Sequence, residues 1–120
     1  MDEIDDKARK FLPLTEATYY ILVSLIEPRH GYGIMQNVAA ISEKQVRIGP
    51  GTLYGALTNL VKQKLIERVG EQESDGERRK VYGLTGLGKS VIFLESKRLV
   101  VLAEMGRLAM EKLNDVKSEK

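Results

Sequence analysis

One helical segment combines small residues with side chains that can hydrogen-bond to nucleic acid. The stretch GPGTLYGALTNL begins at Gly49, and apolar residues at helical spacing define its predicted buried face: Leu53, Leu57, Leu60 and Val61. The opposite face carries small, polar or basic residues: Thr52, Gly55, Thr58, Asn59 and Lys62. Hydroxyl, amide and ammonium groups can contact phosphates or read base edges. This face therefore has the chemistry of a DNA-reading helix.

The glycines of this segment, Gly51 and Gly55, leave two explanations open. Each costs a helix interior about 1 kcal/mol relative to alanine. Either they pack against another helix, or they let the helix backbone approach DNA closely. The distribution of charge favours DNA, because residues 44–68 include five basic residues and one acid, a net charge of +4. Two of these basic residues, Lys44 and Arg47, precede the helix and are predicted to contact phosphates, as is Lys62 within it.

A second basic element is the stretch GERRKVY, which contains Arg78, Arg79 and Lys80. We predict that these residues lie at the base of a β-hairpin, where they contact the phosphate backbone. Alternation along a strand places Arg78 and Lys80 on one face and Arg79 on the other. The predicted tip is acidic, which argues against its deep insertion into DNA; its acids are Glu71, Glu73, Asp75 and Glu77.

The helices that position these residues are predicted from helix-capping and helix-breaking residues. Residues 1–12 read as an N-terminal arm. A nearly all-apolar helix follows the cap Thr15 and is predicted to stop at Pro28. The RHGYGI turn leads into a second helix with Ile34, Val38 and Ile41 on one face. The third helix begins at Pro50 and ends near Gln63.

The second part of the chain predicts two strands and one long helix. KLIERV and RRKVYGLT flank the turn signal Asp75-Gly76. Thr85 caps a final helix over residues 86–114, followed by a polar tail over 115–120. The predicted fold is mainly α with a small antiparallel β-hairpin. It is a winged helix-turn-helix over residues 13–85, extended by a C-terminal dimerisation helix.

The final helix has two apolar faces, whereas packing on one small domain needs a single face. Positions spaced four and three apart form the predicted dimer seam: Leu87, Val91, Leu94, Val101, Met105 and Leu108. The second face contains Ile92, Leu99, Leu102, Met110 and Leu113. Arg98 interrupts the seam and is predicted to pair with Glu95 or with an acid of the partner. A twofold dimer sets its recognition helices about 34 Å apart, which predicts a palindromic operator.

Three motifs in this order, HGYGI, GTLYGALTNLVKQKLI and GERRKVYGLTGLG, resemble the PadR family of transcriptional regulators. The resemblance covers roughly residues 14–88. It implies a dimeric winged-helix repressor relieved by a small-molecule effector. It also implies DNA-facing roles for Tyr32, Thr52, Tyr54, Asn59, Lys62 and the basic wing strand. One branch of the family binds flat ligands with a tryptophan at the dimer interface, and this chain has no tryptophan. The remaining aromatic candidates for an effector pocket are Tyr19, Tyr20 and Phe93. The default role of these three residues is core packing.

Other functional classes find little support in the sequence. The stretch GLTGLGKS matches a phosphate-binding loop, but the 30 residues after Ser90 predict one helix and leave no room for a parallel sheet. The chain has no cysteine and a single histidine, His30, which is expected to cap a helix or to pack against its neighbours. We therefore predict neither an enzyme nor a cofactor or metal site. The acidic N-terminus and absence of a long apolar run predict a cytoplasmic protein. The alternative function is a winged-helix protein-interaction module that binds no DNA, although Tyr54 is its only sizeable surface anchor.

Overall fold

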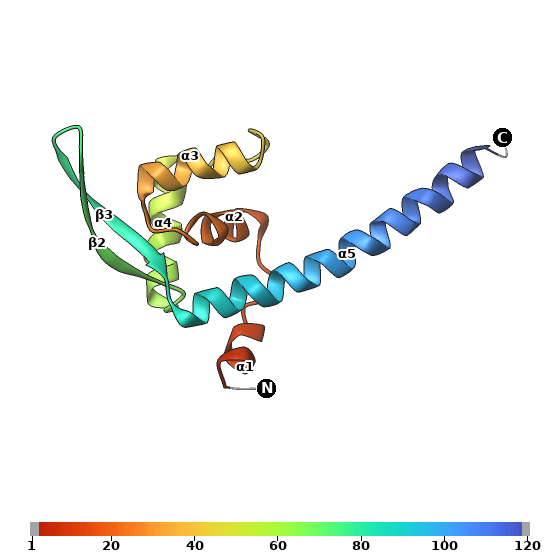
Figure 1. Cartoon of the computed structure of the whole chain (residues 1–120), viewed down its shortest axis with the longest axis horizontal. Coiled ribbons are helices and arrows are strands. Elements are labelled where there is room, and N and C mark those ends of the chain that lie inside the picture. Colours follow the sequence, from red (N-terminus) through yellow and green to blue (C-terminus); the bar gives the residue numbers. More distant parts are fainter. Residues whose placement is uncertain (1–2, 119–120) are drawn as a thin grey trace.

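The computed structural model describes residues 3–118, with the side chains of Ser74 and residues 116–118 outside that description. Figure 1 shows a body of short helices, a β-hairpin that projects from one side of it, and a long helix that runs away on the other. The elements follow one another as α1 (Glu3–Arg9), α2 (Glu16–Ser24), β1 (Arg29–His30), α3 (Gly31–Ile41), α4 (Pro50–Lys62), β2 (Ile66–Ser74), β3 (Glu77–Leu84) and α5 (Gly86–Ser118). No helix within residues 3–118 is both long and apolar enough to cross a membrane.

The core lies between α2, α3 and α4 and extends to the start of α5. The helices α2, α3 and α4 bury Ile21, Leu22, Ile34, Val38, Leu53, Leu57 and Leu60. Two members of the predicted apolar faces lie outside this core, since Val61 is 41% exposed and Ile41 is 44% exposed. Each stands at the last turn of its helix, where the neighbouring helices no longer cover the face.

The β-hairpin, which we call the wing, belongs to a three-stranded antiparallel sheet of order β1-β3-β2. The turn at Asp75-Gly76 is confirmed, with φ of 52° and 78° at the two residues. The prediction that residues 70–77 form a long tip beyond the paired strands is wrong, however, because β2 and β3 stay paired up to this turn. Glu73 lies opposite Arg78, and charge pairs of this kind support the ladder. The basic stretch 78–80 consequently lies near the wing tip and not at its base.

Strand β1 was not predicted from the sequence. Its two residues, Arg29 and His30, pair with Tyr82 and Val81 of β3. This pairing attaches the base of the wing to the segment between α2 and α3. From Lys80 to the tip, the described pairing of β3 is with β2 alone.

Several boundaries differ from the predicted ones. Residues 3–9 of the predicted arm form α1, whose Ala8 is fully buried. Helix α2 ends at Ser24, before Pro28. Helix α3 begins at Gly31, inside the predicted turn, because the His30 imidazole Nδ1 accepts a hydrogen bond from the Gly33 amide at 3.0 Å and caps it. Helix α5 continues to Ser118, so residues 115–118 are helical and not a tail; residues 119–120 lie outside the description.

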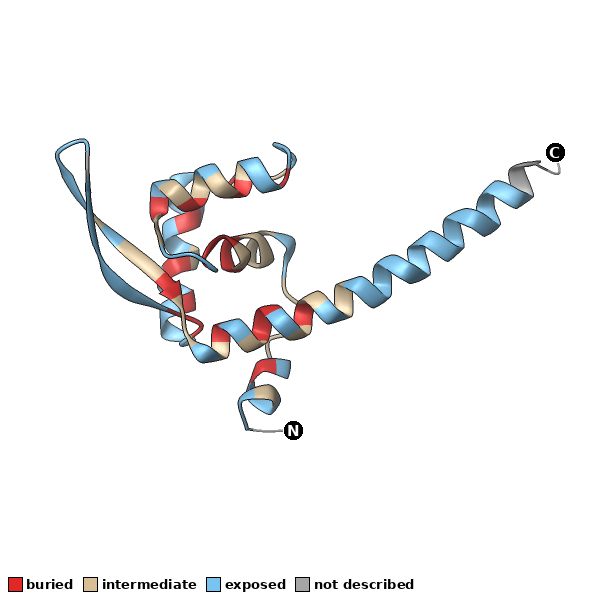
Figure 2. Ribbon diagram, in the orientation of Figure 1, coloured by how far each residue is buried: buried red, intermediate tan, exposed pale blue. Residues whose placement is uncertain are grey.

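Helix α5 divides into two halves with different surroundings (Figure 2). Near its start, Val91 is 0% exposed and Ile92 is 8% exposed, while Leu87 and Leu94 pack partly buried against the core. From Val100 to Asp115 every described residue is exposed. The prediction that Val91 contacts a partner is wrong, because its own chain covers it completely. Leu87 and Leu94 are partly covered in the same way.

The start of α5 is fixed by two hydrogen bonds and one close backbone contact. The Thr85 hydroxyl accepts a hydrogen bond from the Gly88 amide at 3.0 Å and donates one to the Lys64 carbonyl at 2.6 Å, which confirms Thr85 as the cap. A Cβ atom at Gly88 would lie 2.0 Å from the carbonyl oxygen of Leu65. Only glycine fits between α5 and the start of the wing.

Candidate nucleic-acid interface

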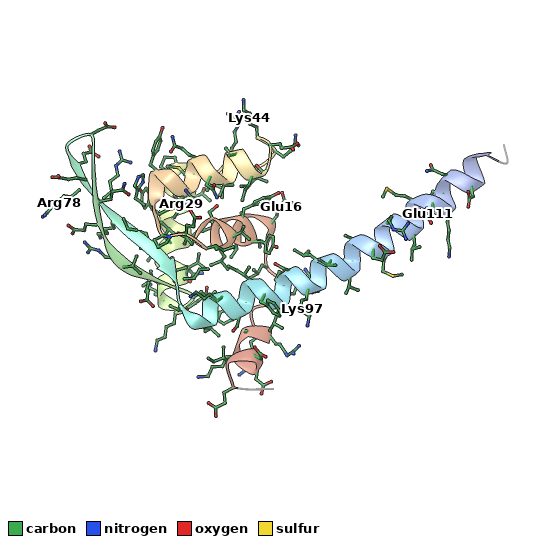
Figure 3. All side chains as sticks on the ribbon, in the orientation of Figure 1. Glu16, Arg29, Lys44, Arg78, Lys97 and Glu111 are labelled. Atoms are coloured by element: carbon green, nitrogen blue, oxygen red, sulfur yellow. The ribbon has the colours of Figure 1, made fainter. Side chains whose placement is uncertain are left out.

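The turn between α3 and α4 sets the angle of α4. The buried Ser42 hydroxyl accepts a hydrogen bond from the Val46 amide at 3.0 Å and donates one to the Val46 carbonyl at 3.2 Å. Glu43 and Lys44 adopt the left-handed region, with φ of 52° and 66°. This conformation turns the chain sharply and leaves Lys44 and Arg47 exposed ahead of α4. In Figure 3, Lys44 lies at this turn, well away from Glu111 on the far half of α5.

The two glycines of α4, Gly51 and Gly55, lie on its exposed face. A Cβ atom at Gly51 or at Gly55 would meet no atom within 4 Å. The explanation that these glycines pack against another helix is therefore wrong for this chain. What remains is a helix face with no side chains at these positions, bordered by exposed polar and basic residues: Thr52, Thr58, Asn59 and Lys62. A flat surface could approach the backbone of α4 at this face.

The predicted DNA-facing residues of α4 divide between its two flanks. Tyr54 and Thr58 line the cleft between α4 and the wing. The Thr58 hydroxyl donates a hydrogen bond to the Tyr54 carbonyl at 3.0 Å, which leaves its oxygen free to accept another. Asn59 lies on the other flank and lines a groove with Phe11 and Thr15. The structure thus does not bring Asn59 together with the wing-side residues.

The cleft between α4 and the wing has a volume of about 470 Å³. Its wing side is formed by the basic stretch of β3, whose members differ in exposure. The Arg78 side chain is 78% exposed, whereas that of Arg79 is 27% exposed. Lys80 is exposed as well, so the predicted alternation of faces agrees with the structure. Figure 3 shows Arg78 on the wing.

Gly31, the first residue of α3, also lines this cleft. A Cβ atom at Gly31 would lie 2.6 Å from the Tyr54 hydroxyl, so the Tyr54 ring lies directly against the backbone at this glycine. The adjacent Tyr32 is 49% exposed, and its ring centroid lies 5.4 Å from the Arg79 guanidinium carbon. Sequence reasoning missed the contact between Gly31 and Tyr54. The one available signal was a glycine at a position where a helix begins.

The predicted effector pocket corresponds in part to a groove between α2 and α5. It has a volume of about 410 Å³ and is lined by Leu14, Glu16, Tyr19, Tyr20, Glu95 and Leu99. Its two helices are linked by a 2.7 Å hydrogen bond between the hydroxyls of Tyr19 and Ser96. Phe93 does not line this groove; it borders a separate hollow with Ile26 and Ile92, so its assignment to the same pocket is wrong.

Glu95, which sequence reasoning did not place in this groove, has a fully buried carboxylate there. It accepts hydrogen bonds from the Leu14 amide at 2.7 Å and from Arg98 at 2.5 and 3.1 Å, so the predicted intrahelical pairing with Arg98 is confirmed. The hydrogen bond from Arg98 lowers the pKa of the Glu95 carboxyl, burial opposes it, and the Leu14 amide lowers it further. The carboxylate therefore stays charged near neutrality.

The stretch GLTGLGKS does not have the geometry of a phosphate-binding loop. It spans the end of β3 and the first turns of α5, and β3 belongs to an antiparallel sheet. The Gly88 amide, which a phosphate would need, is bonded to Thr85. Of its three glycines, Gly88 is the one that lies against the Leu65 carbonyl.

A helix pair joined by a short connection, here residues 42–49, and followed by a wing defines a winged helix-turn-helix protein. Comparison with known proteins agrees with this fold. A PadR-like protein from Bacteroides fragilis is 29% identical, with 90% of this chain and 99% of that chain covered and a TM-score of 0.62. PadR from Bacillus subtilis, solved in complex with operator DNA, is 22% identical over 68% of this chain and 46% of that one, with a TM-score of 0.58.

Two comparisons were made at the level of sequence, and one of them names a family. An uncharacterized protein X from Lysinibacillus sphaericus is 34% identical over 95 residues, which cover 78% of this chain and 87% of the relative. The model of the transcriptional regulator PadR-like family matches residues 20–93. The chain belongs to this family.

Proposed function

We propose that this protein is a sequence-specific DNA-binding repressor in which α4 enters the major groove. The observation that carries the proposal is the open space at Gly51 and Gly55 on the exposed face of α4. Membership of a family of transcriptional regulators supports it, and so does the likeness to Bacillus subtilis PadR, which binds operator DNA. We assign base reading to Thr52 and to Asn59, which would reach DNA from the flank away from the wing, and phosphate contacts to Lys44, Arg47 and Lys62.

Selection of genomic fragments by the purified protein tests this proposal and supplies the operator. The variant Gly55→Leu then separates binding from folding. Removing a glycine favours the helix by about 1 kcal/mol, and the new side chain meets no atom of its own chain at Cβ. We expect unchanged or higher thermal stability together with loss of operator binding. Enrichment of no fragment would favour the protein-interaction module, and a Gly55→Leu variant that binds normally would remove α4 from the groove.

The phosphate contacts are tested by the salt dependence of binding. Each lost phosphate contact lowers the slope of log affinity against log salt by about 0.9. We expect this decrease for Lys62→Ala. The matched control is Lys97→Ala, which removes the same charge from α5, where Lys97 contacts the Phe93 ring at 5.6 Å. Equal slopes for the two variants would place Lys62 away from the phosphates.

We further propose that two copies associate through the far half of α5 and so read a palindromic operator. Its exposed apolar side chains include Val101, Met105, Leu108, Leu102, Met110 and Leu113. Large contiguous apolar patches on the surface of a soluble protein usually mark interaction sites. The polar side of the same half is defined by Arg107, which contacts Glu104 at 2.7 Å and Glu111 at 2.6 Å. A second copy that covers the apolar side leaves this ion-paired side in solvent.

The groove between α2 and α5 is proposed to bind an apolar or aromatic effector that releases the operator. Its position supports this role, because it lies where α5 meets α2 of the body that carries α4. A ligand there could change the position of α5 relative to that body. The neutral fluorescent aromatic N-phenyl-1-naphthylamine serves as the probe. We expect Tyr20→Ala to reduce its binding and Phe93→Ala, in the separate hollow, to leave it unchanged. Equal binding to both variants and the original protein would exclude this groove.

A further inference from the structure

The outer part of the wing lacks support from a third strand. Strand β1 pairs with β3 at Tyr82 and Val81, toward the base of the wing. Beyond this point the hairpin continues to the turn at Asp75-Gly76. A two-stranded hairpin is marginal in water on its own. The angle between the wing tip and α4 therefore depends on side chains that join the outer wing to the helices.

Arg79 is such a side chain. It alone of the basic stretch 78–80 is partly buried, and its guanidinium carbon lies 5.4 Å from the ring centroid of Tyr32 in α3. A guanidinium over the face of a tyrosine ring at this distance is attracted by the ring quadrupole. The contact joins β3 to the first turn of α3.

The same turn of α3 is held against α4. Tyr54 of α4 lies against Gly31, the residue before Tyr32, so closely that a side chain at position 31 would displace the Tyr54 ring. A chain of contacts thus connects the wing to α3 and α3 to α4. Arg79 contacts Tyr32, and the adjacent Gly31 contacts Tyr54. A change in the Arg79 contact would alter the separation between the wing and the DNA-facing side of α4.

The surroundings of Arg79 fit a structural contact better than a phosphate contact. Its Nε atom is buried and has no hydrogen-bond partner among the described residues. Its Nη2 atom lies 3.7 Å from the Glu77 carboxylate on the same strand. Arg78 also has an acidic neighbour, with its Nε atom 3.6 Å from the Glu71 carboxylate, but its side chain is 78% exposed and so is open to a phosphate. Neighbouring arginines on one strand therefore have different environments.

We infer that Arg79 is a positioning residue that holds the wing at a fixed angle to α4 by stacking on Tyr32. The functional consequence of this inference rests on the proposed DNA binding. The contact between Arg79 and Tyr32, and the wing angle that it fixes, do not. It reassigns Arg79, which the sequence predicted as a phosphate contact. It also assigns to Tyr32 a role that its aromatic ring fulfils without its hydroxyl.

The geometric arm of the test needs no DNA. Because the chain contains no cysteine, Gln36→Cys in α3 and Glu73→Cys in the wing can be spin-labelled specifically. Both positions are exposed. We expect Arg79→Gln and Tyr32→Leu to broaden the distance distribution between the labels, and Tyr32→Phe and Arg78→Gln to leave it unchanged. An Arg79→Gln distribution identical to that of the original sequence would overturn the inference.

The binding arm distinguishes positioning from phosphate contact. Arg79→Gln and Tyr32→Leu should each weaken operator binding about tenfold, with the double variant no weaker than either one, because both remove one contact. Arg79→Gln should keep the salt slope, whereas Arg78→Gln should lower it by about 0.9. Additive losses and a lowered slope for Arg79→Gln would make it a phosphate contact. If the original protein binds no DNA, the proposed function fails while the labelling result still decides the role of Arg79.

Discussion

The two halves of α5 are continuous in backbone and similar in apolar content, yet their surroundings differ completely. The near half places Val91 and Glu95 in the protein interior, with 0% and 1% exposure. The far half leaves Val101 63% and Met105 59% exposed. Apolar periodicity is thus the same signal in both halves, but in one it reflects the core and in the other a surface without a partner in the single chain. The difference shows that periodicity identifies a face and does not identify what covers it.

The largest expected effect is in the near half, at Gly88. Gly88→Ala should destabilise the protein by about 3 kcal/mol, because overpacking against backbone cannot be relieved by a side-chain movement. The clash is with the Leu65 carbonyl oxygen, 2.0 Å from the new Cβ. Thermal unfolding measures it. Gly86→Ala is the control, since a Cβ atom there meets nothing within 4 Å. Similar stability of the two variants would contradict the close packing of this half.

The next effect separates the far half from the near one. Val101→Asp with Met105→Asp should give a monomer by light scattering and lower operator affinity by about 100-fold, because a monomer reads one half-site. The thermal midpoint of the body should stay close to that of the original protein. Arg107→Asp, which places an acid on the ion-paired side, is the control and should remain dimeric. A double variant that stays dimeric would place the interface elsewhere.

Local signals account for what the sequence predicted well. The caps Thr85 and His30 and the turn Asp75-Gly76 each depend on a few adjacent residues, and the structure confirms all three. The class of fold followed from the order of these elements. The glycines of α4 were recognised as unusual, and the structure removed one of their two explanations by showing open space.

What the sequence did not predict depends on contacts between distant segments. Strand β1 has two residues and exists because β3 lies beside it. Helices α1 and α2 both pack against α5, and Val91 is fully buried. Phe93 lines a different hollow from Tyr19. The sequence predicted that Glu95 pairs with Arg98, but it predicted neither the burial of this carboxylate nor its hydrogen bond from the distant Leu14 amide.

A third prediction compares an acid of each half. Glu95→Gln should destabilise the protein by about 2 kcal/mol at pH 7, because the Leu14 amide and Arg98 lose a charged acceptor. The pKa of Glu95 is lowered below its ordinary value of 4.5 in the folded state. Its stabilising contribution is therefore fully present above that value and disappears as the pH falls through the lower, folded pKa.

The difference in stability between the original protein and Glu95→Gln should accordingly shrink as the pH is lowered below 4.5. Denaturant unfolding at a series of pH values measures it. The control is Glu104→Gln in the far half, where the Arg107 guanidinium lowers the pKa of an exposed carboxyl and the core should not respond. A pH-independent difference would show that Glu95 acts through its shape and not its charge.

The smallest effect concerns Gly106, the counterpart of Gly88 in the far half. A Cβ atom at Gly106 meets nothing of its own chain within 4 Å, so Gly106→Ala should stabilise the helix by about 1 kcal/mol through propensity alone. Gly106 lies one turn from Leu102 and one turn from Met110, so it stands among the exposed apolar residues of the proposed interface. We expect a small rise in thermal midpoint that is independent of protein concentration. A fall in the midpoint, steeper at low protein concentration, would instead show that the partner helix packs closely over Gly106. Glycine to alanine would then lower the thermal stability at Gly88 and raise it at Gly106. The sign of the change would show whether each half of α5 is closely packed against a neighbouring segment.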